Sequence, residues 1–142
     1  MKVKVKLEHE NAKVPTRATE HSNGYDIYAA EPARIAPGQR VAVATGVKLE
    51  IPEGYVGMAC PRSGRAIKDG LTLINPPGII DSDYRGEVKA LLINHSQAPI
   101  YIQIGERVMQ MVFVKTEEID FEEVTELSDT QRGTGGLGHT GK

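Results

Sequence analysis

Alternation of apolar and polar residues dominates this chain and begins at its amino terminus. In the segment MKVKVKLE, Val3, Val5 and Leu7 are separated by lysines, a period of two that puts apolar side chains on one face of a strand. Further short runs of strand type occur at 40–51, 55–60, 71–75, 87–94, 99–104, 107–115 and 119–124. Turn signals such as Asn23-Gly24 and Pro37-Gly38 separate them. Many short strands at this spacing predict an all-β sandwich, jelly roll or barrel.

One short helix is predicted at 63–69. Ser63 can cap it, Ala66 and Ile67 give it a small apolar face, and Gly70 supplies a left-handed stop. After residue 124 the alternation ends, and the glycine-rich residues 128–142 contain one large apolar side chain. Such a segment cannot fold through its own apolar burial. We therefore expect a single β domain at 1–127 and a flexible C-terminal arm at 128–142.

Composition narrows the class of protein and of partner. The 142 residues fit one domain, and 39% hydrophobic with 25% charged residues argues against disorder. No apolar run approaches the roughly 18 residues of a membrane span, and no apolar block has signal-peptide length, so we expect a cytoplasmic protein with no membrane partner. The net charge of −2 gives no basic field for nucleic acid. A single cysteine, Cys60, excludes an intrachain disulfide and a cysteine-rich zinc site, and the four histidines lie too far apart in sequence for a local ligand pair. Any metal would therefore be held by oxygen.

Three local motifs carry groups suited to chemistry. Pro61-Arg62-Ser63-Gly64 combines a guanidinium and a hydroxyl where a strand ends, which suits an oxygen anion. Taken alone, ordinary capping by Ser63 beside a surface arginine is the more common explanation of such a motif. The segment 78–87, GIIDSDYRGE, puts a carboxylate on a predicted hairpin, where it could orient a water; acidic turns are common without such a role. The glycines of the arm could cradle an anion beside Arg132, or the arm could simply be mobile.

Five blocks taken in order are more specific than any one of them. They read GYDIYAA at 24–30, PRSG at 61–64, GIIDSDYRGE at 78–87, GERVMQ at 105–110 and RGTGGLGHTG at 132–141. In this order they resemble the five motifs of the trimeric deoxyuridine triphosphatases, the dUTPases. The resemblance implies a jelly-roll-like distorted β-barrel with one short helix. It also implies a homotrimer whose three sites lie at subunit interfaces, each drawing motifs from more than one chain.

The resemblance also implies a reaction. Members of the family hydrolyse dUTP to dUMP and pyrophosphate by attack of water on the α-phosphorus, which keeps uracil out of DNA and supplies dUMP for dTMP synthesis. Asp81 matches the family's catalytic carboxylate, which activates the water. The expected cofactor is Mg²⁺, and Asp26 matches the acid linked to it through water. The arm is expected to close over bound dUTP.

The remaining site residues follow from the same motifs. The residues that match phosphate contacts are Arg62, Ser63, Gly64, Gln110 and Arg132. Those that match nucleoside contacts are Asn75, Gly78, Ile80, Tyr84 and Leu137. In the family, backbone groups of this hairpin read uracil, and Tyr84 matches the residue that packs under the deoxyribose and leaves no room for a 2′-hydroxyl. Arg107 belongs to the fourth motif, and we expect it to form a structural ion pair.

Some positions depart from the family pattern. Leu137 stands where most members have a phenylalanine that stacks on uracil, so base capping should be weaker here. His139 replaces a usual serine, and Arg65 replaces a usual leucine. None of these changes removes a catalytic group.

Two other functions fit parts of the pattern. The dCTP deaminases share this fold and the Pro-Arg-Ser type of motif, but they usually need a glutamate in the base pocket, and the run at 81–86 with Arg132 favours a dUTPase. A nucleotide-dependent regulatory binding module would use nucleotide occupancy to control the order of the arm. No inserted segment in the 142 residues resembles a partner-specific domain.

Overall fold

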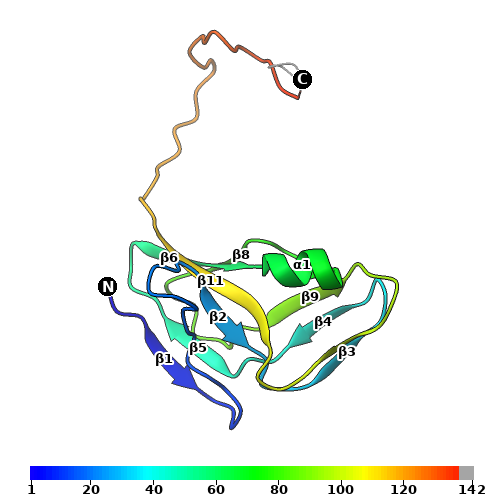
Figure 1. The fold of residues 1–142 in the computed structure, drawn as a ribbon. Helices are drawn as coiled ribbons and strands as arrows, with labels where there is room; N and C mark the ends of the chain where they lie inside the picture. Colours follow the sequence, from blue (N-terminus) through cyan, green and yellow to red (C-terminus); the bar gives the residue numbers. More distant parts are fainter. Residues whose placement is uncertain (138–142) are drawn as a thin grey trace.

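Short antiparallel strands build the domain, with one surface helix. The structure is a computed structural model, and it describes residues 1–137. The strands are β1 (Lys4–Leu7), β2 (Tyr25–Tyr28), β3 (Ala33–Ile35), β4 (Arg40–Val43), β5 (Val47–Glu50), β6 (Tyr55–Cys60), β7 (Leu71–Leu73), β8 (Gly78–Ile80), β9 (Ala90–Asn94), β10 (Ile100–Ile102) and β11 (Arg107–Lys115), and the helix is α1 (Ser63–Asp69). The predicted all-β class with one short helix is confirmed (Figure 1).

The strands form four small sheets, all with antiparallel pairs. The largest has the order β2-β11-β6-β8, and the next has the order β4-β9-β7; the pairs β1-β5 and β10-β3 complete the set in the described part of the chain. Strands that are neighbours in a sheet are often distant in sequence, as in β2-β11, which is typical of jelly rolls. Within residues 1–137 the pairing leaves these sheets separate, so the jelly-roll-like domain is not a closed barrel.

The hydrophobic core lies between the two larger sheets. Met109 and Met111 of β11 point into it from one sheet, and Leu92 of β9 from the other; all three are at most 1% exposed. The one large polar side chain in this layer, Asn94, is fully buried. Its amide nitrogen donates to the carbonyls of Ile35 at 2.9 Å and Ala98 at 2.8 Å, so both of its N–H groups are hydrogen-bonded despite burial.

Several strand predictions need correction. The run at 40–51 is broken at 44–46, because Gly46 adopts φ 65° and the chain passes there from one sheet to another. The runs at 71–75, 87–94 and 99–104 form shorter strands than predicted. The run at 119–124 forms no strand, and its Phe121 is 97% exposed, since no strand of the described chain lies beside it. The strands β2, β3 and β8 were not predicted as strands.

The helix has the predicted bounds but not the predicted packing. Gly70 ends it in the left-handed conformation, with φ 69°. The N-cap position is Arg62, without a side-chain cap, so the predicted Ser63 cap is wrong. No residue of α1 is buried, and Ile67 is 84% exposed, so the predicted apolar face does not pack on the domain. The polar side of the helix makes its contacts instead: Arg65 pairs with Glu106, which precedes β11.

After β11 the chain leaves the domain. The amide of Thr116 donates to the carbonyl of Gly54 at 2.9 Å, the last backbone hydrogen bond to the domain that the described chain makes. The following segment extends away from the sheets (Figure 1), and Phe121, Leu127 and Leu137 are almost fully exposed. Residues 138–142 of the predicted arm, His139 among them, lie outside the described residues. No helix in the described part of the chain is long and apolar enough to cross a membrane.

Candidate active site

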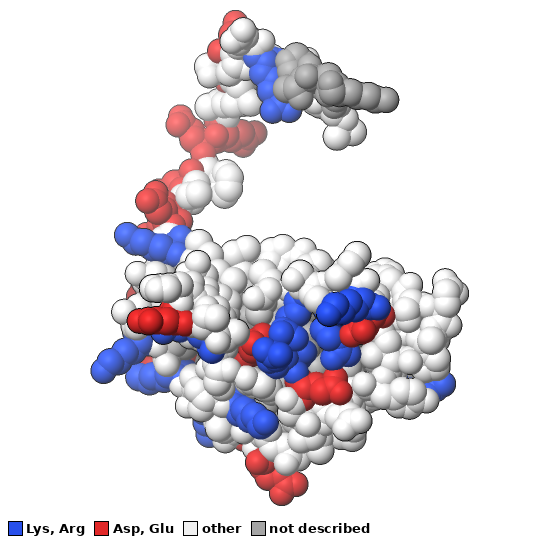
Figure 2. All heavy atoms as spheres, in the orientation of Figure 1, with Lys and Arg blue, Asp and Glu red and all other residues white. Residues whose placement is uncertain are grey.

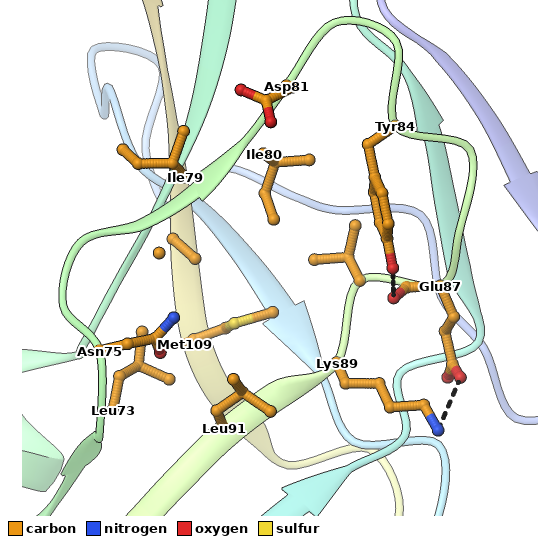
Figure 3. Close-up of a pocket in the computed structure, with 13 residues that line it drawn as sticks. Leu73, Asn75, Ile79, Ile80, Asp81, Tyr84, Glu87, Lys89, Leu91 and Met109 are labelled. Carbon is orange, nitrogen blue, oxygen red and sulfur yellow. Dashed lines mark hydrogen bonds and ion pairs between the residues drawn. The ribbon is translucent and has the colours of Figure 1, made fainter.

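A first pocket lies beside the hairpin that follows the Pro76-Pro77 turn. We call this cavity of about 450 Å³ the hairpin pocket. Among its lining residues are the predicted site residues Asn75, Gly78, Ile80, Asp81 and Tyr84. In Figure 3 Asp81 and Tyr84 stand on the loop at one end of the pocket and Asn75 lies at the other, with apolar side chains between them. A flat organic ring with polar edges suits this lining.

Hydrogen bonds within the loop of the hairpin hold its backbone in place. The backbone N–H of Tyr84 donates to the carbonyl of Asp81 at 3.2 Å, and the Arg85 guanidinium donates to the carbonyl of Ser82 at 2.6 Å. Asp81 comes directly after β8 and is exposed. Among the described residues no cation lies within ion-pair distance of its carboxylate, so the carboxylate faces solvent as a free acceptor.

A second pocket lies between β2, β11 and the start of α1. We call this cavity of about 320 Å³ the arginine pocket; its lining includes Arg62, Ser63, Gly64 and Gln110. The amide of Gln110 donates to the carbonyl of Pro61 at 3.0 Å, which ties β11 to the segment before α1. These four residues are the phosphate contacts that the second and fourth motifs predict, and the fold brings them together.

The absence of a side chain at Gly24, just before β2, shapes the arginine pocket. A Cβ on Gly24 would lie 2.2 Å from Oε1 of Gln110, so a side chain there would displace the amide. The motif that starts at Gly24 therefore leaves room for a predicted phosphate contact. The sequence alone could not reveal this, because Gly24 and Gln110 meet only through the pairing of β2 with β11.

Asp26 lies in the wall of the arginine pocket and binds two guanidiniums. Its Oδ1 is 2.9 Å from Nε of Arg62, and its Oδ2 is 3.2 Å from Nη1 of Arg107. The Asp26 side chain is only 10% exposed, and a charge buried to this extent needs ion-pair or hydrogen-bond partners. The structural ion pair predicted for Arg107 is confirmed. Figure 2 shows basic and acidic side chains intermixed on the face below α1.

The two pockets lie on opposite sides of the largest sheet. Met109 and Gln110 are neighbours on β11, and successive residues of a strand point to opposite faces. Met109 lines the hairpin pocket from the buried face, whereas Gln110 lines the arginine pocket. The two linings share no residue. A small ligand cannot pass between strands about 4.8 Å apart, so no ligand can occupy both pockets of one chain through the sheet.

The described residues do not form a metal-binding site on their own. They contain no group of three or more His, Cys, Asp or Glu side chains that could hold an ion. Both oxygens of Asp26 already have guanidinium partners. Mg²⁺ is usually held by one or two carboxylates together with substrate phosphates and water. The donor set therefore fits Mg²⁺ that arrives with a phosphate ligand and does not fit a metal held by the protein alone.

The described residues of the arm, 128–137, line neither pocket. Arg132 donates from Nε to the carbonyl of Gly135 at 2.8 Å within the arm, and Leu137 is fully exposed. Neither lines the hairpin pocket or the arginine pocket. The residues that the motifs single out are thus divided into three groups in one chain.

The motif analysis missed some residues of the hairpin pocket. Leu73, Leu91 and Met109 form much of its apolar lining, and Lys89 stands at its side (Figure 3). Their strand positions were predicted, but nothing in the sequence indicates which strands meet behind the hairpin.

Comparison with known proteins gives consistent results. The dUTPase family model matches residues 10–141. A deoxyuridine 5′-triphosphate nucleotidohydrolase of Nautilia profundicola is 46% identical over 142 residues, covering 100% of both chains. One of Corynebacterium glutamicum is 50% identical over 130 residues, covering 91% of this chain and 87% of its own.

The fold is also similar to solved structures of dUTPases. The dUTPase of Staphylococcus bacteriophage 80alpha with dUpNHpp has a TM-score of 0.93 and 29% identity, with 99% of both chains covered. A variant dUTPase of the S. aureus phage phi11, described as revealing the coordination of a structural Mg(II) ion, has a TM-score of 0.84 and 26% identity, with 91% of this chain and 100% of its own covered.

Proposed function

This chain belongs to the dUTPase family, and from that premise we propose that it hydrolyses dUTP to dUMP and pyrophosphate in a site shared between subunits of a homotrimer. One observation carries the proposal: the groups suited to a nucleoside and to phosphates occupy two pockets on opposite sides of one sheet. A nucleotide can contact both if the hairpin pocket of one chain faces the arginine pocket of another. The arm of a chain would complete such a site.

Asp81 is the proposed general base. In the reaction, Asp81 accepts a proton from the attacking water while the water oxygen bonds to the α-phosphorus. The bond from that phosphorus to the bridging oxygen breaks, and its electron pair leaves with pyrophosphate. The exposed position of Asp81 at the mouth of the hairpin pocket, without an ion-pair partner among the described residues, supports this role.

The arginine pocket is the proposed site of the phosphates. Arg62 supplies charge, and Ser63 and Gln110 supply hydrogen-bond donors that fix direction. Phosphoryl transfer depends mainly on positioning and on stabilisation of charge, so these groups are sufficient in type. We assign Arg132 of the arm to the same phosphates, since a second guanidinium helps to offset their charge.

Mg²⁺ is the proposed cofactor. Bound to the triphosphate, it would neutralise charge on the phosphate oxygens. Asp26 would contact it through water, because the carboxylate oxygens of Asp26 are held by Arg62 and Arg107. The two guanidiniums fix the direction of the carboxylate toward the arginine pocket.

Uracil selection follows from the position of β8. This strand is the last of its sheet, so the backbone groups on its outer edge have no partner strand in the described chain. Uracil offers a donor at position 3 and an acceptor at position 4, which backbone groups of Gly78 and Ile80 can match. Cytosine presents the reverse pattern and would be rejected. Asn75 and Leu137 would contact the nucleoside from either side.

A pyrophosphate-release assay tests the proposal. We expect rapid turnover of dUTP with Mg²⁺, little with UTP, dCTP or dTTP, and a strong decrease when Mg²⁺ is chelated. Release of ammonia from dCTP would instead identify a deaminase. Binding of dUTP without release of pyrophosphate would indicate a regulatory binding module.

A further inference from the structure

The carboxylate of Glu87 joins the hairpin to a distant turn. Its Oε1 accepts the backbone N–H of Thr45 at 3.0 Å and that of Gly46 at 2.8 Å. The side chain is 25% exposed, and its Oε2 is 3.5 Å from Nζ of Lys89. Hydrogen bonds from two N–H groups to one charged oxygen are among the stronger contacts available to a loop. Glu87 therefore fixes the end of the hairpin to the turn between β4 and β5.

That turn is a rigid anchor. Thr45 is fully buried, and its hydroxyl donates to the carbonyl of Val88 at 2.6 Å and accepts the N–H of Val47 at 3.2 Å. The N–H of Val88 donates in turn to the carbonyl of Val47 at 2.9 Å. Gly46 has φ 65°, and a Cβ there would lie 2.5 Å from the Cβ of His9. The turn is therefore held by buried hydrogen bonds and packs closely against His9.

The same residue also holds the tyrosine of the pocket. The hydroxyl of Tyr84 donates to the backbone carbonyl of Glu87 at 3.0 Å (Figure 3). Gly86 allows this close approach, because a Cβ there would lie 2.3 Å from the Tyr84 hydroxyl. The Tyr84 side chain is 42% exposed and has no other hydrogen bond among the described residues. The position of its ring thus depends on the backbone of Glu87.

We propose that Glu87 is a positioning residue for Tyr84, and that its carboxylate sets the preference for deoxyribose over ribose. The inference rests on the proposed dUTP hydrolysis. Ribose differs from deoxyribose by one hydroxyl, and a pocket rejects an added hydroxyl only weakly unless its wall is held firmly. Anchoring at Thr45 and Gly46 keeps the ring of Tyr84 from yielding to a 2′-hydroxyl.

Three substitutions of Glu87 separate geometry from charge. Glu87→Gln keeps an oxygen that can accept both N–H groups, Glu87→Asp keeps the charge but is one methylene too short, and Glu87→Ala removes the acceptor. The measured quantity is kcat/KM for dUTP divided by kcat/KM for UTP, from pyrophosphate release. We expect this ratio to fall about 10-fold in the Asp and Ala variants and to stay within about 3-fold of the wild-type value in the Gln variant. Asp83→Asn, which removes an exposed carboxylate of the same hairpin that lines neither pocket, is the matched control and should leave the ratio unchanged.

A double-variant cycle completes the test. Tyr84→Phe keeps the ring and removes its hydrogen bond to Glu87, so it should lower the same ratio. In the double variant, Tyr84→Phe with Glu87→Asp, the ratio should stay within about 3-fold of its value in the single variants, because both substitutions act on the same contact. A ratio that stays at the wild-type value in the Asp and Ala variants, or losses that multiply in the double variant, would overturn the inference. Wild-type protein that releases no pyrophosphate from dUTP would instead overturn the proposed function.

Discussion

Asp81 is the residue on which the proposed chemistry depends most directly. It is exposed and comes directly after β8, and its carbonyl accepts a hydrogen bond from the backbone N–H of Tyr84. The loop therefore fixes the backbone of Asp81 while leaving the carboxylate free. A second acid of the hairpin, Asp83, is also exposed but does not line the hairpin pocket.

Asp81→Asn should lower kcat for dUTP about 10²- to 10⁴-fold, the usual range for removal of a general base, with pyrophosphate release as the assay. The amide keeps the shape of the carboxylate, so the Kd of dUpNHpp by calorimetry should change little. Asp83→Asn is the control and should retain near wild-type turnover. Undiminished kcat in the Asp81 variant would exclude Asp81 as the base.

At the scale of the elements, ion pairs connect strands and helix where apolar packing is absent. α1 has no buried residue, yet Arg65 is 2.8 Å from Glu106 and 2.6 Å from Asp69. Arg65 is also a departure from the family pattern. The first two residues of the helix, Ser63 and Gly64, line the arginine pocket, so this ion-pair cluster helps to hold one wall of the proposed phosphate site.

Arg65→Leu should reduce the free energy of unfolding by about 1 kcal/mol, since it leaves Glu106 and Asp69 without their common partner. Lys68→Leu on the same helix removes a cation that has no ion pair in the described chain, and we expect it to be nearly neutral. Urea unfolding followed by circular dichroism measures both. Equal effects of the two variants would show that the cluster does not stabilise α1.

An ion-pair cluster around Glu8, beside the paired strands β1 and β5, makes a pH-dependent contribution to the stability of the fold. A hydrogen bond from Lys48, and next one from Lys6, lowers the pKa of Glu8 to about 2 from its ordinary value of 4.5. Because the folded pKa lies below the unfolded one, the ion pairs stabilise the fold above about pH 4.5, and this contribution is lost as the pH falls toward 2. The group lies at the surface, so the effect is small and is screened by salt.

Glu8→Gln should therefore lose less stability than wild type when the pH is lowered from about 5 to about 3. Urea midpoints at the two pH values give the comparison, and high salt should reduce the difference. Glu10→Gln, a nearby acid without an ion pair in the described chain, should behave as wild type. A wild-type pH dependence in the Glu8 variant would contradict the assignment.

At the scale of the whole molecule, the groups of the proposed site lie apart in one chain. The hairpin pocket and the arginine pocket lie on opposite sides of a sheet. The described arm residues line neither pocket and extend away from the domain (Figure 1). Association of chains is the simplest way to bring the three groups together. Two experiments test this arrangement.

Mixed assemblies of Asp81→Asn and Arg62→Ala chains should regain activity that each variant lacks. If a site takes Asp81 from one chain and Arg62 from another, random mixing of equal amounts leaves about one quarter of the sites with both groups intact. Pyrophosphate release from co-refolded chains measures the fraction. Activity that remains at background would mean that both residues of a site come from the same chain.

Removal of residues 128–142 should leave the assembly folded and lower dUTP hydrolysis about 10²-fold or more, because Arg132 and closure of the site are lost. The exposed, loosely attached character of the described arm residues is the reason to expect an intact assembly. Sedimentation and circular dichroism monitor the assembly, and the pyrophosphate assay monitors activity. Loss of the trimer on truncation would contradict this division of roles.

The sequence by itself determined the class of fold and the chemistry of each motif. Period-two alternation is a local property of a strand, so 55–60 and 107–115 were predicted with the bounds that the structure has. Gly70 ends α1 as predicted, because the need for a positive φ is also local. The five ordered motifs identified the family that the comparisons confirm.

Only the tertiary structure decided which motifs share a pocket. Met109 and Gln110 are adjacent in sequence but line different pockets, because the pleat of β11 directs them to opposite faces. The segment at 119–124 has the composition of a strand but finds no partner strand in the described chain. The contact of Glu87 with Thr45 spans 42 residues. Contacts of this kind depend on how the sheets pack, which no local pattern of residues encodes.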